Sequence, residues 1–183
     1  MSAVAAPGPL IGRNEFERMQ AAAASGVRLE RMEGYVYAMA GAGLAHERMV
    51  ARLIVALDEP ARSNGCEVVG SNRRLSVGEG NDFLPDVAVY CDPTDDDDYA
   101  GLRPCLVVEV LSRSTAVDDL NLKLPRYKRV PSIEAILFIN PSPLYAELFV
   151  RSDDDWEKHH LTDADDELVL PCPPAVVRLG DLV

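Results

Sequence analysis

The 183-residue sequence lacks any apolar run near the ~18 residues that a membrane-spanning helix needs. Its first ten residues contain neither lysine nor arginine and hold no long apolar segment, so the sequence predicts no secretory signal peptide. These absences argue against a membrane protein. We therefore expect a cytoplasmic protein that makes no membrane contact.

Several catalytic and metal-binding patterns are also missing. There is no Gly-x-Ser-x-Gly sequence, which disfavours a serine hydrolase, and no glycine-rich loop that would cradle phosphates. The four cysteines, Cys66, Cys91, Cys105 and Cys172, form no Cys-x-x-Cys pair and stand at no zinc-finger spacing to a histidine. We therefore expect reduced cysteines that pack as small buried hydrophobic side chains.

Positive charge is scarce. The chain has 18 lysines and arginines against 30 aspartates and glutamates, which gives a net charge of −12. Because basic side chains supply much of the affinity for nucleic acids, this balance weakens a nucleic-acid-binding hypothesis. The charge is uneven, however: five aspartates fall within residues 92–98 and eight acids within 153–167, whereas residues 103–129 are locally basic. The net charge therefore does not exclude a nucleic-acid partner.

The length and composition are typical of one globular domain, which we expect over residues 13–183 after a flexible tail at residues 1–12. Apolar residues at three- and four-residue spacing predict a long amphipathic helix from Leu44 to about Ser63. A shorter helix is expected to begin at Asn14, whose spacing to Glu17 resembles a capping box.

Apolar runs separated by turn-forming residues predict a set of strands. The runs 83–90 and 106–111 are nearly continuous and suit central strands covered on both faces. Other strands are expected at 27–32, 35–39, 66–69, 74–77, 133–139, 144–150 and 156–161, and a third helix at 118–129. The predicted fold class is α/β, with helices packed against a curved mixed sheet.

Two carboxylates occur in strongly apolar surroundings. Asp86 follows Pro85 in Phe-Leu-Pro-Asp-Val-Ala-Val-Tyr, and Glu109 lies in Leu-Val-Val-Glu-Val-Leu. An ionised carboxylate in a buried strand is costly unless it is paired, hydrogen-bonded or bound to a metal. Two of them on neighbouring strands favour a shared Mg²⁺, which prefers oxygen ligands. The alternative is that both are strand-end carboxylates that face solvent.

Charged residues elsewhere extend the candidate site. Asp119, Lys123 and Tyr127 stand four residues apart and share one face of the expected helix. Lys123 could reach the carboxylates and stabilise charge in a phosphoryl transition state, or it could form a solvated salt bridge with Asp119. His46 could transfer a proton or contact a phosphate, or it could be an exposed residue at the start of the long helix.

These motifs follow one another in a specific order. The order comprises Leu29–Gly34, Met39 with His46, Leu84–Val87, Leu106–Thr115, and finally Asp119, Lys123, Leu124 and Tyr127. Over about residues 13–150 it resembles the Uma-like family of putative restriction endonucleases, in the PD-(D/E)xK nuclease superfamily. The resemblance implies a restriction-endonuclease-like fold and hydrolysis of phosphodiester bonds in DNA that depends on Mg²⁺ or Mn²⁺.

By position, the resemblance makes Asp86 and Glu109 the metal-binding carboxylates, with the backbone carbonyl of Val110 as a further ligand. Leu111 stands where the superfamily usually has its catalytic lysine, so that role passes to Lys123 on the following helix.

Two further residues complete the site that the resemblance implies. Glu30 is an accessory catalytic acid, and His46 lines the same site. Pro125 falls inside the expected helix and predicts a kink next to Lys123.

Two other functions stay open. A catalytically inactive nuclease-like module that binds nucleic acid or protein would tolerate the acidic charge and Pro125. A metal-dependent hydrolase of small phosphate esters would need no basic groove. Homodimerisation is a further expectation from the resemblance, because small nucleases of this superfamily often pair to cut both DNA strands.

Overall fold

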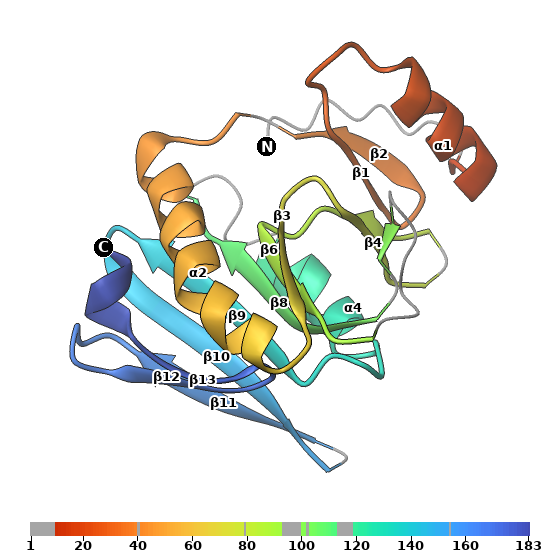
Figure 1. Ribbon diagram of the computed structural model, residues 1–183. Coiled ribbons are helices and arrows are strands. Elements are labelled where there is room, and N and C mark those ends of the chain that lie inside the picture. The colour runs from red at the N-terminus through yellow and green to blue at the C-terminus, as the bar shows by residue number, and fades with distance from the viewer. Residues whose placement is uncertain are drawn as a thin grey trace.

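The structure is a computed structural model that describes residues 10–39, 41–78, 80–92, 100–101, 103–112, 119–153 and 155–183 (Figure 1). The helices are α1 (Arg13–Ala22), α2 (Leu44–Ser63), the π-helical turn η1 (Asp119–Lys123), α4 (Leu124–Tyr127) and the 3₁₀ turn η2 (Leu179–Leu182). The strands are β1 (Leu29–Met32), β2 (Tyr35–Ala38), β3 (Glu67–Gly70), β4 (Arg74–Ser76), β5 (Asp82–Phe83), β6 (Val87–Tyr90), β7 (Ala100–Gly101), β8 (Pro104–Val110), β9 (Ala135–Pro141), β10 (Leu144–Ser152), β11 (Asp155–Leu161), β12 (Glu167–Pro171) and β13 (Pro174–Arg178).

A six-stranded sheet in the order β11-β10-β9-β8-β6-β3 is the centre of the fold. The neighbours β8 and β9 are parallel and all other neighbouring strands are antiparallel, so the sheet is mixed. The central strand β8 is buried along its whole length. These features confirm the predicted mixed α/β fold.

The two faces of this sheet carry separate apolar cores. On one face, alternate residues such as Val108 and Leu137 pack with α2 and with the β12–β13 hairpin. On the other, Val107 and Ile136 pack with α4 and with the second sheet. The helix α2 has the bounds that its apolar periodicity predicts, and it lies across the first face in Figure 1.

The second sheet has five strands in the order β2-β1-β5-β4-β7. Its β1–β2 hairpin turns at Glu33 and Gly34, whose φ angles are 52° and 83°. A two-residue turn with two positive φ values matches the twist of the strands it joins, which confirms the predicted turn. Ile11 lies within the expected tail, but its N–H donates to the Gly34 carbonyl at 2.7 Å, so this part of the chain is anchored to the hairpin.

The prediction of one strand over residues 83–90 is wrong. The segment divides into β5, in the five-stranded sheet, and β6, in the six-stranded sheet. Pro85 lies between them and cannot donate a ladder hydrogen bond, which explains the break. The predicted capping box is also wrong, because Asn14 lies inside α1 and the N-cap residue is Gly12.

The helix expected at 118–129 is shorter and of two kinds. A π-helical turn ends at Lys123 and α4 follows at once. Pro125 is in the first turn of α4, where the missing N–H would have no intrahelical partner. The proline therefore lies at a tolerated position instead of kinking a longer helix.

The expectation of four reduced, separate cysteines is wrong for this structure. Cys66 pairs with Cys91 and Cys105 pairs with Cys172 in two disulfides, with Cα–Cα distances of 4.1 and 5.9 Å. The residues are 25 and 67 positions apart in the sequence, so no local spacing could have revealed the pairs.

Within the described part of the chain, no helix is long and apolar enough to cross a membrane. Arg113, Ser114 and Thr115, and the side chain of Asp119, belong to the predicted motifs but lie outside the described residues.

Candidate active site

A buried ion-pair triad joins three of the residues that the sequence singles out. Glu30 comes from β1, Glu109 from β8, and Lys123 from the end of η1. Lys123 Nζ lies 3.1 Å from Glu30 Oε1 and 3.1 Å from Glu109 Oε1. Each of the three side chains is at most 4% exposed. Charges taken so far out of water require this kind of mutual pairing.

Further contacts fix the carboxylates of the triad. Glu30 Oε1 accepts a hydrogen bond from the backbone N–H of Leu84 at 2.7 Å, and the Tyr127 hydroxyl donates to Glu109 Oε1 at 2.5 Å. The ammonium of Lys123 lies 5.7 Å from the centre of the Phe83 ring, close enough for a cation–π contact. Lys123 and Tyr127, four residues apart, thus contact the same carboxylate oxygen of Glu109.

Asp86 and His46 form a second, less buried pair. His46 Nε2 lies 3.2 Å from Asp86 Oδ2, and the two side chains are 16% and 14% exposed. The hydrogen bond to Asp86 raises the pKa of His46 above its ordinary value of 6.5, against the opposing effect of burial. His46 is at the start of α2 and Asp86 immediately precedes β6, so this pair lies where the two elements begin.

The backbone of β8 connects the two clusters. The N–H of Val110 donates to Asp86 Oδ2 at 2.8 Å. Asp86 therefore contacts the residue that directly follows Glu109 in β8. The strands β6 and β8 pair antiparallel with Val87 opposite Val108, and one further step in that register puts Asp86 beside Glu109. The fold thus gathers all the residues that the sequence nominates at one end of β6 and β8.

The carboxylates do not form a tight multidentate cage. Among the described residues, the one group of three or more His, Cys, Asp or Glu ligand atoms within 4.8 Å of one another consists of cysteines. Asp86 and Glu109 therefore present carboxylates from two neighbouring segments, with His46 against the first and Lys123 and Tyr127 against the second. One or two carboxylates are the protein ligands that Mg²⁺ commonly takes, together with waters and substrate phosphate.

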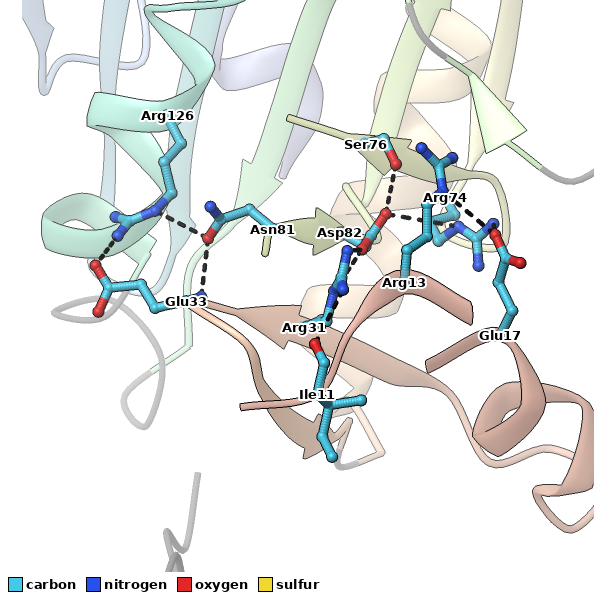
Figure 2. Close-up of polar contacts among 10 residues, drawn as sticks. All are labelled: Ile11, Arg13, Glu17, Arg31, Glu33, Arg74, Ser76, Asn81, Asp82 and Arg126. Atoms are coloured by element: carbon cyan, nitrogen blue, oxygen red, sulfur yellow. Dashed lines mark hydrogen bonds and ion pairs between the residues drawn. The ribbon is translucent and has the colours of Figure 1, made fainter. Parts of the chain in front are cut away.

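Sequence reasoning missed an arginine network beside this site (Figure 2). Arg31 pairs with Asp82 at 2.6 Å, and both side chains are at most 5% exposed. Arg126 pairs with Glu33 and donates to Asn81 Oδ1 at 3.0 Å. In the sequence, this network is indicated by the polar pair Asn81–Asp82, which stands next to apolar residues. The pair does not indicate which arginines it contacts.

This network borders a pocket of about 1090 Å³. Among the residues that the structure describes, its lining includes four arginines, Arg13, Arg31, Arg126 and Arg129, and one acidic residue, Glu33. Arg126 follows Lys123 by three residues and Glu33 follows Glu30 by three, so the pocket and the carboxylate site share the same two segments. An arginine-lined pocket therefore adjoins the carboxylate site, although Arg13, Arg31 and Arg126 are each paired with a carboxylate.

Comparisons with known proteins identify the family and agree with the fold. The sequence profile of the Uma2 family, described as "Putative restriction endonuclease", matches residues 13–179. Two uncharacterized proteins of Synechocystis sp. are each 32% identical to the chain, one over 69% of this chain and 68% of its own length, the other over 61% and 65%. The fold resembles the crystal structure of a putative nuclease belonging to DUF820 from Anabaena variabilis, with a TM-score of 0.74, 14% identity, and coverage of 94% of this chain and 97% of that one.

Proposed function

Because the chain belongs to the Uma2 family of putative restriction endonucleases, we propose that it is a metal-dependent endonuclease that hydrolyses phosphodiester bonds in DNA. One observation carries the proposal. Lys123 contacts Glu109 at a buried site, and Asp86 lies next to it through its hydrogen bond with the N–H of Val110. A lone buried salt bridge would need no second carboxylate on the neighbouring strand, whereas phosphoryl transfer uses a metal-binding pair and a cation together.

Asp86, Glu109 and the backbone carbonyl of Val110 would hold Mg²⁺ or Mn²⁺. Their oxygen donors fit such hard cations, and the small number of protein ligands leaves room for water and a phosphate. When bound, the metal supplies an acidified water and polarisation of the scissile phosphate.

The other residues of the site would act on the substrate and on the carboxylates. Lys123 would neutralise charge that develops on the phosphate, and Glu30 holds its ammonium beside Glu109. Tyr127 orients Glu109 through its hydroxyl. His46 holds Asp86, and its raised pKa keeps the imidazole able to donate a proton.

The arginine pocket would bind the DNA backbone next to the site of cleavage. Arginine forms bidentate hydrogen bonds with phosphates, and Arg129 is exposed at the rim of the α4 segment.

Replacing Arg129 by glutamine is expected to weaken DNA binding and to lower the magnitude of the salt-dependence slope by about 0.9, the value for one phosphate contact. Arg62→Gln is the matched control, because Arg62 is an exposed arginine at the C-terminal end of α2, away from the pocket lining. Fluorescence anisotropy over a series of salt concentrations measures both slopes. Equal slopes for the two variants would remove Arg129 from the DNA-binding surface.

A second candidate function follows from the burial of the ion-pair triad, which leaves its charged groups little access to solvent. Because Glu30, Glu109 and Lys123 are almost completely buried and paired with one another, the site also suits a non-catalytic module of the same fold. A hydrolase of small phosphate esters is the remaining alternative.

Incubation of the wild-type protein with supercoiled plasmid, in Mg²⁺, in Mn²⁺ and in a chelator, separates these candidates. We expect nicked or linear plasmid with metal and intact plasmid with chelator. Hydrolysis of p-nitrophenyl phosphate without plasmid cleavage would favour the small-ester hydrolase, and metal-independent binding with no hydrolysis would favour the inactive module.

A further inference from the structure

The four cysteines form one cluster. Besides its disulfide to Cys66, Cys91 Sγ lies 3.4 Å from Cys105 Sγ and 3.4 Å from Cys172 Sγ. The sulfur atoms of Cys66, Cys91 and Cys172 all lie within 4.8 Å of one another. The two disulfides are therefore in direct contact, with Cys91 at the centre of the group.

Each cysteine comes from a different part of the fold. Cys66 follows α2, Cys91 follows β6, Cys105 is in β8, and Cys172 is in the turn between β12 and β13. Cys66 and Cys105 are buried within the apolar core, and Cys91 and Cys172 are half-buried against it. The packing of these elements, and not a local Cys-x-x-Cys loop, holds the four sulfurs in place.

The same positions suit a tetrahedral thiolate site. Zn²⁺ binds four cysteine sulfurs at about 2.3 Å, which separates the sulfurs by about 3.8 Å. The two cross-disulfide distances of 3.4 Å are already close to this value, and reduction frees the two bonded pairs to separate. The four sulfurs are thus already gathered in one place before any metal binds.

We propose that the reduced protein binds one thiophilic divalent cation, Zn²⁺, through Cys66, Cys91, Cys105 and Cys172, and that the disulfide form does not. Each disulfide takes two electrons and two protons from a dithiol reductant, which leaves four thiols and two oxidised reductant molecules. Binding of Zn²⁺ then releases the thiol protons to solvent as the sulfurs become thiolate ligands.

This site is structural and distinct from the carboxylate site. Four protein ligands complete the coordination of zinc and leave no open position for a substrate. Asp86 and Cys91 flank opposite ends of β6, roughly 16 Å apart at about 3.3 Å per residue. The sulfur ligands select a soft cation, whereas the carboxylates select Mg²⁺ or Mn²⁺.

The position of the cysteine cluster suits it to stabilising the fold. The elements α2, β6 and β8 carry His46, Asp86 and Glu109 at or next to one end, and they carry cysteines at or next to the other. A metal bound by the cysteines would hold these ends together in a reducing environment, where disulfides do not persist. Zn²⁺ is therefore expected to raise the melting temperature of the reduced protein.

Titration with Co²⁺ tests the proposal. Protein reduced with dithiothreitol is freed of reductant without oxygen, its four thiols are counted with Ellman's reagent, and Co²⁺ is added. We expect one Co²⁺ per chain, with the visible bands of tetrahedral cobalt and a thiolate-to-metal charge-transfer band, and complete displacement by Zn²⁺. The oxidised protein should show none of these bands.

Two variants localise the metal. Cys91→Ser/Cys172→Ser should lose the charge-transfer band, whereas Asp86→Asn/Glu109→Gln should keep it unchanged, which separates this site from the proposed catalytic one. Because cysteine variants can fail to fold, ¹¹³Cd NMR of the reduced wild-type protein provides a second measurement, with a chemical shift that indicates four sulfur ligands. The proposal is overturned if four free thiols bind no Co²⁺, if the folded protein resists reduction, or if the bands persist in the double cysteine variant.

Discussion

Replacing Lys123 by methionine is expected to destabilise the fold by about 3–5 kcal/mol, the cost of leaving buried charges without their partner. Lys123 is the cation between Glu30 and Glu109, and all three side chains are at most 4% exposed. Methionine fills most of the same volume, so the loss would be mainly electrostatic: two carboxylates would face each other without water.

Lys158→Met is the matched control for this substitution. Lys158 also pairs with a glutamate, Glu147, at 2.8 Å, but its side chain is 49% exposed. Such a surface pair contributes about 0–1 kcal/mol. Urea denaturation of both variants measures the difference, and adding Glu30→Gln and Glu109→Gln to Lys123→Met should recover much of the loss. Equal stability of the two single variants would contradict a charged, buried triad.

Asp86→Asn and Glu109→Gln are each expected to lower the rate of DNA cleavage by at least roughly a hundredfold. A metal ion contributes several kcal/mol of transition-state stabilisation, and each amide removes the negative charge that holds it. Asparagine keeps an oxygen that can accept the Val110 N–H, and after Glu109→Gln the ammonium of Lys123 still contacts Glu30. Both variants should therefore fold.

The cleavage assay needs an acidic residue outside the site as its control. Glu167→Gln serves, because Glu167 is an exposed carboxylate at the start of β12. Rates are measured under single-turnover conditions with Mg²⁺ and with Mn²⁺. A variant at either Asp86 or Glu109 that cleaves as fast as Glu167→Gln would remove that residue from the catalytic site.

Local patterns in the sequence were sufficient for the elements that depend on local physics. The bounds of α2 follow from the spacing of its apolar residues, and the β1–β2 turn follows from Glu33–Gly34. Glu109 could be singled out because a charge between Val108 and Val110 needs a partner in the folded protein. Lys123 was nominated for the same region, and the fold brings the two within 3.1 Å.

Features that depend on distant parts of the chain could not be predicted. The change of sheet at Pro85 depends on which strands pair with each half of the segment, and apolar content does not encode this. The convergence of the Lys123 ammonium and the Tyr127 hydroxyl on Glu109 depends on the packing of α4 against β8. The two disulfides join residues that are 25 and 67 positions apart in the sequence. The hydrogen bonds of Arg126 in the arginine network span 45 and 93 positions.

The central claim is that Asp86 and Glu109 form a divalent-metal site that serves phosphodiester hydrolysis. Calorimetric titration of Mn²⁺ tests it most directly, with wild-type protein and with Asp86→Asn/Glu109→Gln, in each case with a DNA duplex present to provide phosphate ligands. We expect the wild-type protein to bind the metal and the double variant to show no binding. Equal binding by both proteins, or none by the wild type at millimolar Mn²⁺ with DNA, would contradict it.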